Sequence, residues 1–463
     1  MLKYIKKKGA LLLQHQKSTL LVKKCCRSSQ FVYICLKNII MKEIKPLSLT
    51  IQSEIGQLEA VLMHYPGAEV ENMTPRNAQR ALYSDILNLS IARREYDQLL
   101  GVLQKQSKVY KVSDLLTQLL EHDDNKTNLI RQICATEQVP DYFDYLTNLP
   151  PVTLATILIE GLPLKVSTLT DFLREEYYAL KPLYNFYFTR DASAVIGNSA
   201  LICKMANNVR MREAMIMDAI FGSGLFFETR KLNSYQLSQH NPDIKIEGGD
   251  LLVVREDILL IGNGSRTTTQ GIDMLVKEFC KNGTGKKHVI VQQLPESPES
   301  FIHLDMVFTL LDRDKAMVYK PLIMDSSRYQ TVHIQIDNGR VSRISSAGGI
   351  LSLLRKLGLD LEPVVCGGKA DDWDQEREQW HSGANFLAIA PGKVLSYARN
   401  VHTLEELSKH GFRVVSAAEV IDGHYDHTSP GRCVITLEGS ELPRGGGGPR
   451  CMTMPLRRSP VDW

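Results

Sequence analysis

The sequence predicts an α/β fold built from one repeated unit of two short strands, a helix and a further strand. Two observations carry this prediction. From residue 191 onward, hairpins of two β-rich runs recur, each divided by a turn signal such as Gly197-Asn198 or Pro391-Gly392. The polar residues that open these hairpins are spaced by 59, 55 and 80 residues, which indicates one supersecondary unit used several times. The hairpins occupy residues 191–205, 250–264, 305–319 and 385–399, and they open with Asp191, Asp250, Asp305 and Asn385.

Amphipathic stretches follow the hairpins. Their apolar residues recur every three to four positions, which predicts helices at residues 211–221, 267–279, 351–358 and 404–411. Most of these stretches lead into another β-rich run, and strands are therefore predicted at residues 288–294, 361–366 and 412–417. The order within each unit is ββαβ.

The chain before residue 191 predicts one more unit and an insertion. The opening unit has a strand at 58–66, the helix-like run NLSIARREYDQLLGVLQ and a strand at 107–112. From 113 to 182 the spacing is helical and lacks strand alternation, so we expect an all-helical insertion there. Five such units closing on themselves would bring the polar openings of their hairpins together around one axis.

Composition and charge narrow the class of protein. With 43% hydrophobic and 23% charged residues, the chain is an ordinary folded protein with a full-sized core. Residues 1–40 contain nine Lys or Arg and no acidic residue, and removing these nine charges from the net +3 leaves −6 for the rest. Nucleic-acid phosphates require a basic face, which this mildly acidic body does not predict, so no nucleic-acid partner is expected.

The basic segment 1–40 is interrupted by lysines in every apolar run. No run reaches the ~18 apolar residues of a membrane-spanning helix, so no membrane association is expected. We interpret the segment as a leader or as the product of an upstream start, with the protein proper opening at Met41.

The cysteines are odd in number and scattered, without CxxC pairs or histidines at ligand spacing. This pattern argues against a zinc site. It argues equally against a disulfide framework and favours a reducing, cytoplasmic compartment. The nine are Cys25, Cys26, Cys35, Cys134, Cys203, Cys280, Cys366, Cys433 and Cys451.

Four short stretches place polar residues where a strand should be apolar, and such residues cost free energy unless they are partnered or used. Each stretch alone is a weak signal. A lone cysteine after a glycine run is usually a small buried hydrophobe, and an HxD pair is more often structural than catalytic. The glycine run has neither GxGxxG nor the lysine of a phosphate-binding loop, so nucleotide binding is disfavoured. The stretches are NFYFTRD (185–191), EGGD (247–250), FIHLD (301–305) and RGGGGPRCM (444–452).

Taken together and in this order, the stretches closely resemble the arginine deiminase family. The likeness runs from about Met41 to about Arg457 and also includes SEIGQLEAVLMHYPG, VRMREA, GNGSRTTTQG and DQEREQWHSGANFLAIAPG. The resemblance implies a five-bladed, pseudo-symmetric α/β propeller of ββαβ units across residues 41–463. A helical bundle would be inserted at 113–182.

The resemblance also implies the activity, which is hydrolysis of L-arginine to L-citrulline and ammonia without a cofactor or a metal. Cys451 would be the nucleophile, His303 the general acid and base, and Glu247 the partner that orients His303. Asp191 and Asp305 would grip the guanidinium group. The substrate pocket would be lined by Asn185, Phe188, Arg210 and Arg266, with the two arginines facing the α-carboxylate. A homo-oligomer is expected.

This chemistry is physically coherent. A guanidinium is a planar cation with donors in a rigid fork, so two carboxylates can fix its central carbon. A thiol with an ordinary pKa of about 8.5 needs a nearby cation, here an imidazolium or the substrate, to ionise at neutral pH. The thiolate would attack the guanidinium carbon, and His303 would protonate the departing ammonia and later activate water.

Alternatives of three kinds stay open. The same fold and cysteine chemistry serve amidinotransferases and hydrolases of methylated arginines. A propeller that binds guanidino ligands without turning them over is a third kind, because fold does not fix function. One departure bears on all of them, since Gly446 stands where the family usually has an arginine. A papain-like protease is excluded because its cysteine would precede its histidine.

Overall fold

The computed structural model describes residues 45–74, 85–173, 177–237, 241–282, 285–325 and 328–463. The chain divides into two compact units, residues 1–47 and 48–463. The predicted N-terminal extension, 1–40, lies outside the described residues. Within them, no helix combines the length and the apolar character needed to cross a membrane.

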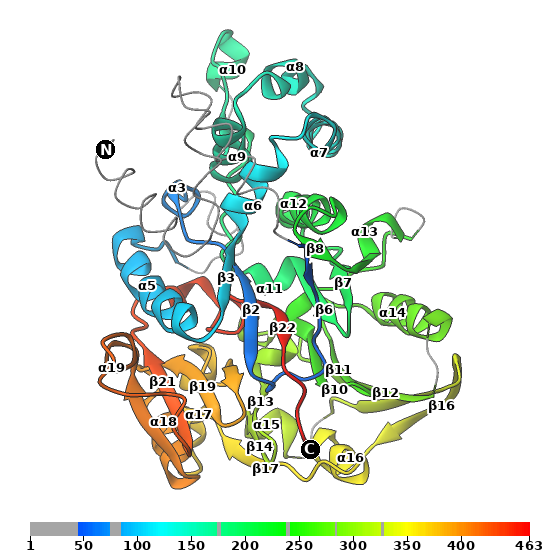
Figure 1. Ribbon diagram of the computed structural model, residues 1–463, viewed down its shortest axis with the longest axis vertical. Coiled ribbons are helices and arrows are strands. Elements are labelled where there is room, and N and C mark those ends of the chain that lie inside the picture. The colour runs from blue at the N-terminus through cyan, green and yellow to red at the C-terminus, as the bar shows by residue number, and fades with distance from the viewer. Residues whose placement is uncertain (1–44, 75–84, 174–176, 238–240, 283–284, 326–327) are drawn as a thin grey trace, which may run out of the picture. The chain divides into compact units, whose positions relative to one another are not determined.

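Five sheets share one plan, in which two antiparallel strands are followed by a strand that pairs in parallel with one of them (Figure 1). The antiparallel pair is a hairpin in four of these sheets, and in the fifth it joins β22 to β2 from the two ends of the described chain. A helix lies before that parallel strand in the sequence. The predicted α/β fold is therefore confirmed. The sheets are β6 (Ser193–Ile196), β7 (Ser199–Ile202) and β9 (Arg230–Asn233); β10 (Leu251–Arg255), β11 (Ile258–Asn263) and β12 (Lys286–Gln293); β13 (Phe308–Asp312), β14 (Lys315–Val318) and β17 (Glu362–Val365); β18 (Leu387–Ala390), β19 (Lys393–Tyr397) and β21 (Arg432–Leu437); and β22 (Met454–Arg458), β2 (Leu58–Met63) and β3 (Lys108–Lys111).

The connecting helices form where the apolar spacing predicts them. In α5 the side chain of Asn88 caps the first turn by accepting hydrogen bonds from the backbone amides of Ser90 and Ile91. The helix then buries residues three to four positions apart, including Tyr96 and Leu99, against the sheets. The connecting helices are α5 (Leu89–Gln106), α12 (Met211–Gly222), α14 (Thr269–Asn282), α16 (Ile350–Lys356) and α18 (Val401–Lys409).

Between residues 113 and 182 the chain is mainly helical but includes one pair of strands. The expectation of an all-helical segment is wrong at β4 (Leu162–Pro163) and β5 (Tyr178–Leu180), which pair antiparallel. Strands this short contain too little alternation for a periodicity to reveal them. The helices are α6 (Val112–Leu119), α7 (Asp123–Thr136), η2 (Pro140–Tyr142), α8 (Phe143–Thr147), α9 (Pro151–Glu160) and α10 (Leu169–Leu173).

Two strand arrangements also differ from the prediction. A hairpin of β15 (Thr331–Asp337) and β16 (Arg340–Ala347) extends the sheet of β12. The predicted strand at 412–417, β20 (Phe412–Ser416), lies at the edge of its sheet, and the later β21 pairs with β19 instead. The capped helix α19 (Ala417–Ile421) connects β20 to β21, and β21 lies between β19 and β20 in the sheet.

The remaining elements are short. They are β1 (Leu47–Ser48), α3 (Ala68–Glu71), α11 (Thr189–Ala192), η3 (Asn208–Arg210), β8 (Phe227–Glu228), α13 (Ser234–Leu237), η5 (Gly248–Asp250), η6 (Glu299–Phe301), η7 (Leu304–Met306), α15 (Lys320–Ile323), α17 (Asp372–Trp380) and η8 (Leu442–Gly445).

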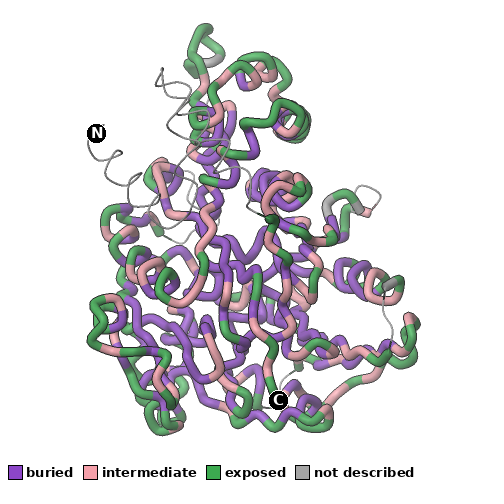
Figure 2. Tube along the Cα trace, in the orientation of Figure 1, coloured by how far each residue is buried: buried purple, intermediate pink, exposed green. Residues whose placement is uncertain are grey.

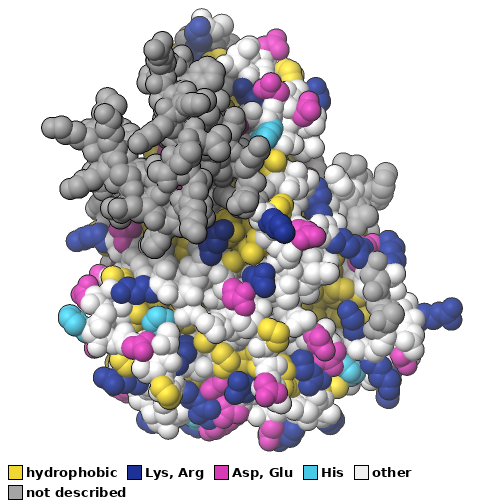
Figure 3. Space-filling view, in the orientation of Figure 1, with side chains coloured by type: hydrophobic (Ala, Val, Ile, Leu, Met, Phe, Trp, Pro, Cys, Tyr) yellow, Lys and Arg dark blue, Asp and Glu magenta, His cyan; other side chains and the backbone are white. Residues whose placement is uncertain are grey.

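Buried residues gather along the strands, whereas the outer helices carry the exposed ones (Figure 2). One apolar cluster lies around β10, β11, β13, β14 and β17, and a second joins β2 and α5 to β18, β19 and β21 and reaches Cys451. Cys451, the predicted nucleophile, therefore packs against the apolar core. On the face shown in Figure 3, basic and acidic side chains intermingle over the described lower part, without a continuous basic patch.

Candidate functional site

The polar residues that open the hairpins converge. Asp191, Asp250 and Asp305 lie in single helical turns, α11, η5 and η7, each directly before its hairpin. The backbone amide of Leu304 donates to Asp250 Oδ1 at 2.9 Å, and Asn385 Nδ2 donates to the carbonyl oxygen of Asp305 at 3.2 Å. The repeat therefore brings residues that are far apart in sequence to one place.

Two glycines of the EGGD stretch make room for this convergence. A Cβ atom on Gly248 would lie 2.0 Å from the carbonyl oxygen of Arg190, and one on Gly249 would lie 2.4 Å from His303 Nδ1. Backbone can approach the imidazole this closely only where no side chain is present.

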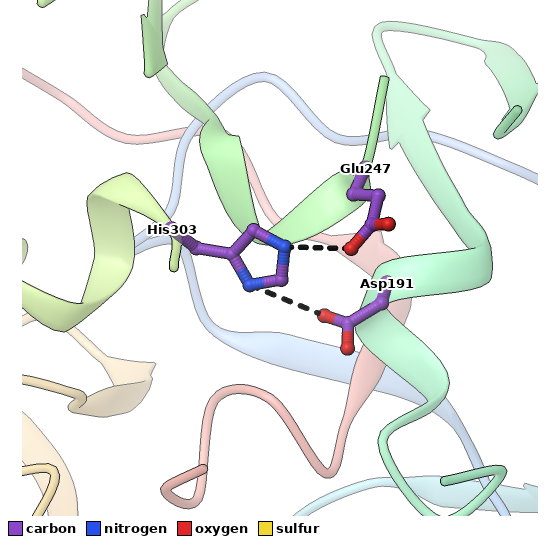
Figure 4. Close-up of side chains that lie close together, drawn as sticks. All are labelled: Asp191, Glu247 and His303. Carbon is purple, nitrogen blue, oxygen red and sulfur yellow. Dashed lines mark hydrogen bonds and ion pairs between the residues drawn. The ribbon is translucent and has the colours of Figure 1, made fainter. Parts of the chain in front are cut away.

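His303 is fully enclosed and lies between two carboxylates (Figure 4). Its Nε2 is 2.9 Å from Glu247 Oε2, and its Nδ1 is 3.7 Å from Asp191 Oδ1. Burial acts to lower the pKa of His303, but the charge of Asp191 and the hydrogen bond to Glu247 outweigh it and raise the pKa to about 9. The pKa of Glu247, which burial would raise, falls to about 2 through its bond to His303. At neutral pH the pair is an imidazolium and a carboxylate.

Cys451 lies beside Asp305 and Asn385. Its Sγ is 3.7 Å from Asp305 Oδ2 and accepts a hydrogen bond from Asn385 Nδ2 at 3.1 Å. Burial, followed by the charges of Asp305 and Asp191, raises the pKa of the Cys451 thiol well above its usual value. Without a ligand the sulfur is therefore a neutral thiol, and a cation bound between it and the carboxylates would favour the thiolate.

Each of the two predicted gripping carboxylates has one oxygen held by an arginine. Asp191 Oδ2 accepts from Arg210 Nη1 at 2.6 Å, and Asp305 Oδ2 accepts from Arg450 Nη1 at 2.7 Å. The other two oxygens, Asp191 Oδ1 and Asp305 Oδ1, are buried and accept no hydrogen bond from the described residues. Buried acceptors of this kind are costly unless a ligand satisfies them, and guanidinium donors have the required chemistry.

The four predicted pocket residues all line one small cavity together with four of the five catalytic candidates, whereas Asp305 is not part of its lining. Its volume is about 30 Å³, far below the ~300 Å³ or more of ordinary small-molecule sites. Gly445, Gly446 and Gly447 form part of its wall. Apart from these glycines the lining is Asn185, Phe188, Asp191, Arg210, Glu247, Arg266, Ile302, His303 and Cys451.

The two predicted carboxylate-binding arginines differ in this state. Arg210 is buried, and Glu213 and Asp191 together occupy its guanidinium. Arg266 is partly exposed, and its Nη1 lies 3.9 Å from Glu247 Oε1. Arg266 also lines a neighbouring cavity that shares Ile302, Gly445 and Gly446 with the inner one. Arg266 is thus the arginine nearer to solvent.

Among the described residues, Asp191, Glu247 and His303 form a group whose ligand atoms lie within 4.8 Å of one another, close enough to hold a metal ion. To bind a metal there, His303 would have to lose a proton. An imidazolium with a pKa near 9 has no free lone pair at neutral pH, and its Nε2 is already bonded to Glu247.

Three residues at the site were not predicted as site residues. Asn385 was identified only as the start of a hairpin. Glu54 and Arg450 form a buried ion pair at 3.1 Å, although they lie near opposite ends of the described sequence. The hydrophobic periodicity of the sequence cannot predict a contact between residues 396 positions apart.

Comparisons with known proteins identify the family of this chain. The model of a family described as arginine deiminase matches residues 79–458. A protein named arginine deiminase from Listeria monocytogenes serotype 4a is 33% identical over 435 residues, covering 90% of this chain and 99% of that protein. One of the same name from Oenococcus oeni is 31% identical over 431 residues, covering 89% of this chain and 98% of that protein. Among solved structures, SxtG, an amidinotransferase from Microseira wollei, is 14% identical with a TM-score of 0.49, covering 89% of this chain and 98% of that chain.

Proposed function

The chain belongs to the arginine deiminase family, and on this basis we propose that its site hydrolyses L-arginine to L-citrulline and ammonia. The observation that carries the proposal is the arrangement around the small cavity. Cys451, His303 and Asp191 line this cavity, and Asp305 lies beside it, with its Oδ2 3.7 Å from Cys451 Sγ. Asp191 and Asp305 each keep one buried oxygen that accepts no hydrogen bond from the described residues. That donor and acceptor set fits a planar cation with five N–H groups.

In the first half of the reaction, Asp191 and Asp305 hold the guanidinium, the substrate's charge promotes ionisation of Cys451, and the thiol proton is released to solvent. The thiolate attacks the guanidinium carbon and forms a C–S bond. His303 gives its proton to one terminal nitrogen, the C–N bond breaks, and ammonia leaves. A covalent thiouronium on Cys451 remains, and the imidazole is neutral.

In the second half, neutral His303 takes a proton from water while the oxygen attacks the thiouronium carbon. The C–S bond then breaks, the electron pair returns to sulfur, and the proton of the added hydroxyl moves to the thiolate, so that neutral citrulline and the Cys451 thiol are formed. Glu247, hydrogen-bonded to Nε2, keeps Nδ1 directed at the reacting groups and stabilises the imidazolium in both halves. No cofactor is needed for this balance of atoms and charges.

Asn185, Phe188, Arg210 and Arg266 are proposed to contact the substrate. Arg266 would meet the α-carboxylate directly, because it lies between the two cavities. Arg210 would do so only after partial release from its two carboxylates.

The finer architecture is also part of the proposal. The five sheets would be blades of a pseudo-symmetric propeller in residues 41–463, with residues 113–182 as a helical insertion. The protein would act in the cytoplasm as a homo-oligomer.

An assay with L-arginine as the only organic substrate tests the function. We expect stoichiometric ammonia and citrulline, with agmatine and methylated arginines turned over more slowly. An amidinotransferase would require a second amine, and a methylarginine hydrolase would prefer the methylated substrate. Absence of product from all three compounds would leave a binding protein and contradict the proposal.

A further inference from the structure

Arg450, directly before Cys451, is a buried arginine that the proposed mechanism does not use, with only 1% of its side chain exposed. Its guanidinium joins two carboxylates. Nε and Nη2 donate to the two oxygens of Glu54, each at 3.1 Å, and Nη1 donates to Asp305 Oδ2 at 2.7 Å. Nη2 also donates to the carbonyl oxygen of Leu251 at 2.7 Å. This set of bonds fixes the fork in one orientation.

The backbone at Arg450 is held as firmly as its side chain. The amides of Arg450 and Cys451 both donate to Asn385 Oδ1, at 3.0 and 3.3 Å. Asn385 Nδ2 in turn donates to Cys451 Sγ. A shift of Arg450 would therefore displace the sulfur.

The charges around Cys451 give Arg450 a second role. Asp305 and Asp191 oppose ionisation of the thiol and raise its pKa, whereas Arg450 acts in the opposite direction. Glu54 holds this cation in place, and its own pKa falls to about 2 because Arg450 and Arg190 overcome the effect of burial. The ion pairs of Arg450 with Glu54 and Asp305 thus determine how much negative charge lies beside Cys451 Sγ.

We propose that Arg450 is a positioning residue for the reaction, with Glu54 as its anchor. By holding Asp305 Oδ2, it leaves Asp305 Oδ1 as the oxygen available to a substrate guanidinium, and it balances the charge beside Cys451. This inference rests on the proposed function. Lysine could supply the charge but not the fork that reaches Glu54 and Asp305 together.

The test combines four variants of the full chain with two readouts. The variants are Arg450→Met, Arg450→Lys, Glu54→Gln and the control Arg212→Met. Arg212 is also a buried arginine, but it pairs with Glu137 and the carbonyl of Leu158, away from the site. The first readout is the pH midpoint of thiolate absorbance, taken as the difference from the same variant with Cys451→Ser. The second is kcat and KM for L-arginine.

The expected midpoint shifts have opposite signs. Arg450→Met raises the midpoint by roughly one pH unit, because the cation near the sulfur is lost. Glu54→Gln lowers the midpoint, because the charge of Arg450 is no longer compensated by Glu54. Arg450→Lys keeps the midpoint near that of the unmodified protein but lowers kcat at least about tenfold, since Asp305 is no longer oriented.

A purely structural role for Arg450 would give a different pattern. All four variants would then lower the melting temperature and leave the midpoint unchanged, and that result would overturn the proposal. If Arg450→Met is insoluble, Glu54→Gln and Arg450→Lys still decide the matter. The thiolate titration needs no substrate, so a protein with the expected midpoints but no citrulline production would contradict the proposed function alone.

Discussion

At the scale of single residues, the site is set by how few carboxylate oxygens are left without a hydrogen bond. Arg210 and Arg450 each take one oxygen of a gripping carboxylate, and Glu247 is engaged by His303. What stays open is one oxygen on Asp191 and one on Asp305. The site can therefore bind a cation without carrying the full repulsion of two unpaired buried carboxylates.

Replacing the nucleophile should abolish turnover without unfolding the protein. Cys451→Ser exchanges sulfur for a hydroxyl that His303 cannot activate as an imidazolium, so kcat should fall at least about a thousandfold. Cys280→Ser in α14 is the matched control and should retain activity. Steady-state citrulline release measures both, and near-normal turnover by Cys451→Ser would exclude the cysteine mechanism.

The raised pKa of His303 predicts a pH-dependent contribution to stability. Folding raises this pKa from 6.5 to about 9, so the contribution is complete below pH 6.5 and is lost as the pH rises through 9. A shift of this size corresponds to about 3 kcal/mol. Urea unfolding of the unmodified protein and of His303→Gln should show a difference in unfolding free energy that declines between pH 6.5 and 9. A constant difference across this window would mean that His303 is neutral in the folded protein.

Metal removal should leave activity unchanged. The substrate already carries the positive charge that a Lewis acid would supply, and the imidazolium of His303 is not a metal ligand. Exhaustive treatment with EDTA followed by the citrulline assay measures this. Loss of activity that zinc or manganese restores would assign Asp191, Glu247 and His303 to a metal instead.

At the scale of elements, the glycine-rich loop is the part of the wall whose conformation limits substitution. Gly446 has φ 84° and ψ 20°, in the left-handed region, and no atom lies within 4 Å of a Cβ placed on it. An arginine there would have space but would strain the backbone by roughly 1–2 kcal/mol.

Two variants separate these effects. Gly446→Ala carries the backbone strain alone, and Gly446→Arg adds a guanidinium that can reach the substrate. We expect KM for L-arginine to be about tenfold lower in Gly446→Arg than in Gly446→Ala, which corresponds to ~1.4 kcal/mol of binding. If both variants show the same fall in kcat, that fall measures the displacement of Cys451. Equal KM values would show that this position does not reach the substrate.

How far the sequence predicts these elements depends on their length and periodicity. The hairpins and α5, α12, α14, α16 and α18 were predicted because their apolar spacing is regular. The β15–β16 hairpin was missed, since β16 is exposed along most of its length and lacks a buried face to alternate with. Of the predicted site residues, all but Asp305 line the cavity, but the Glu54–Arg450 pair depends on folding and could not be derived from spacing.

At the scale of the whole molecule, the two ends of the described unit close on each other. Strand β22 pairs with β2, so that Leu62 lies opposite Met454 and Leu58 opposite Arg458. Cys451 lies three residues before β22 and Glu54 four residues before β2. The site is therefore built where the chain closes, and its geometry depends on that closure.

Removing β22 should consequently unfold the whole unit, although every predicted catalytic residue would remain. Met454 and Leu456 are fully buried, and each stabilises the fold by roughly 1.5–3 kcal/mol. The ladder to β2 and the bond from Arg458 Nη1 to the carbonyl oxygen of Gly56 would be lost as well. Together these losses approach the total stability of ~5–15 kcal/mol typical of folded proteins. A chain ending at Thr453 should give no cooperative thermal transition by circular dichroism. A chain beginning at Met41 is the control and should melt at an unchanged temperature with unchanged activity. If the chain ending at Thr453 melts cooperatively, the remaining sheets are stable without β22, and the pairing of the two ends positions the site without stabilising the fold.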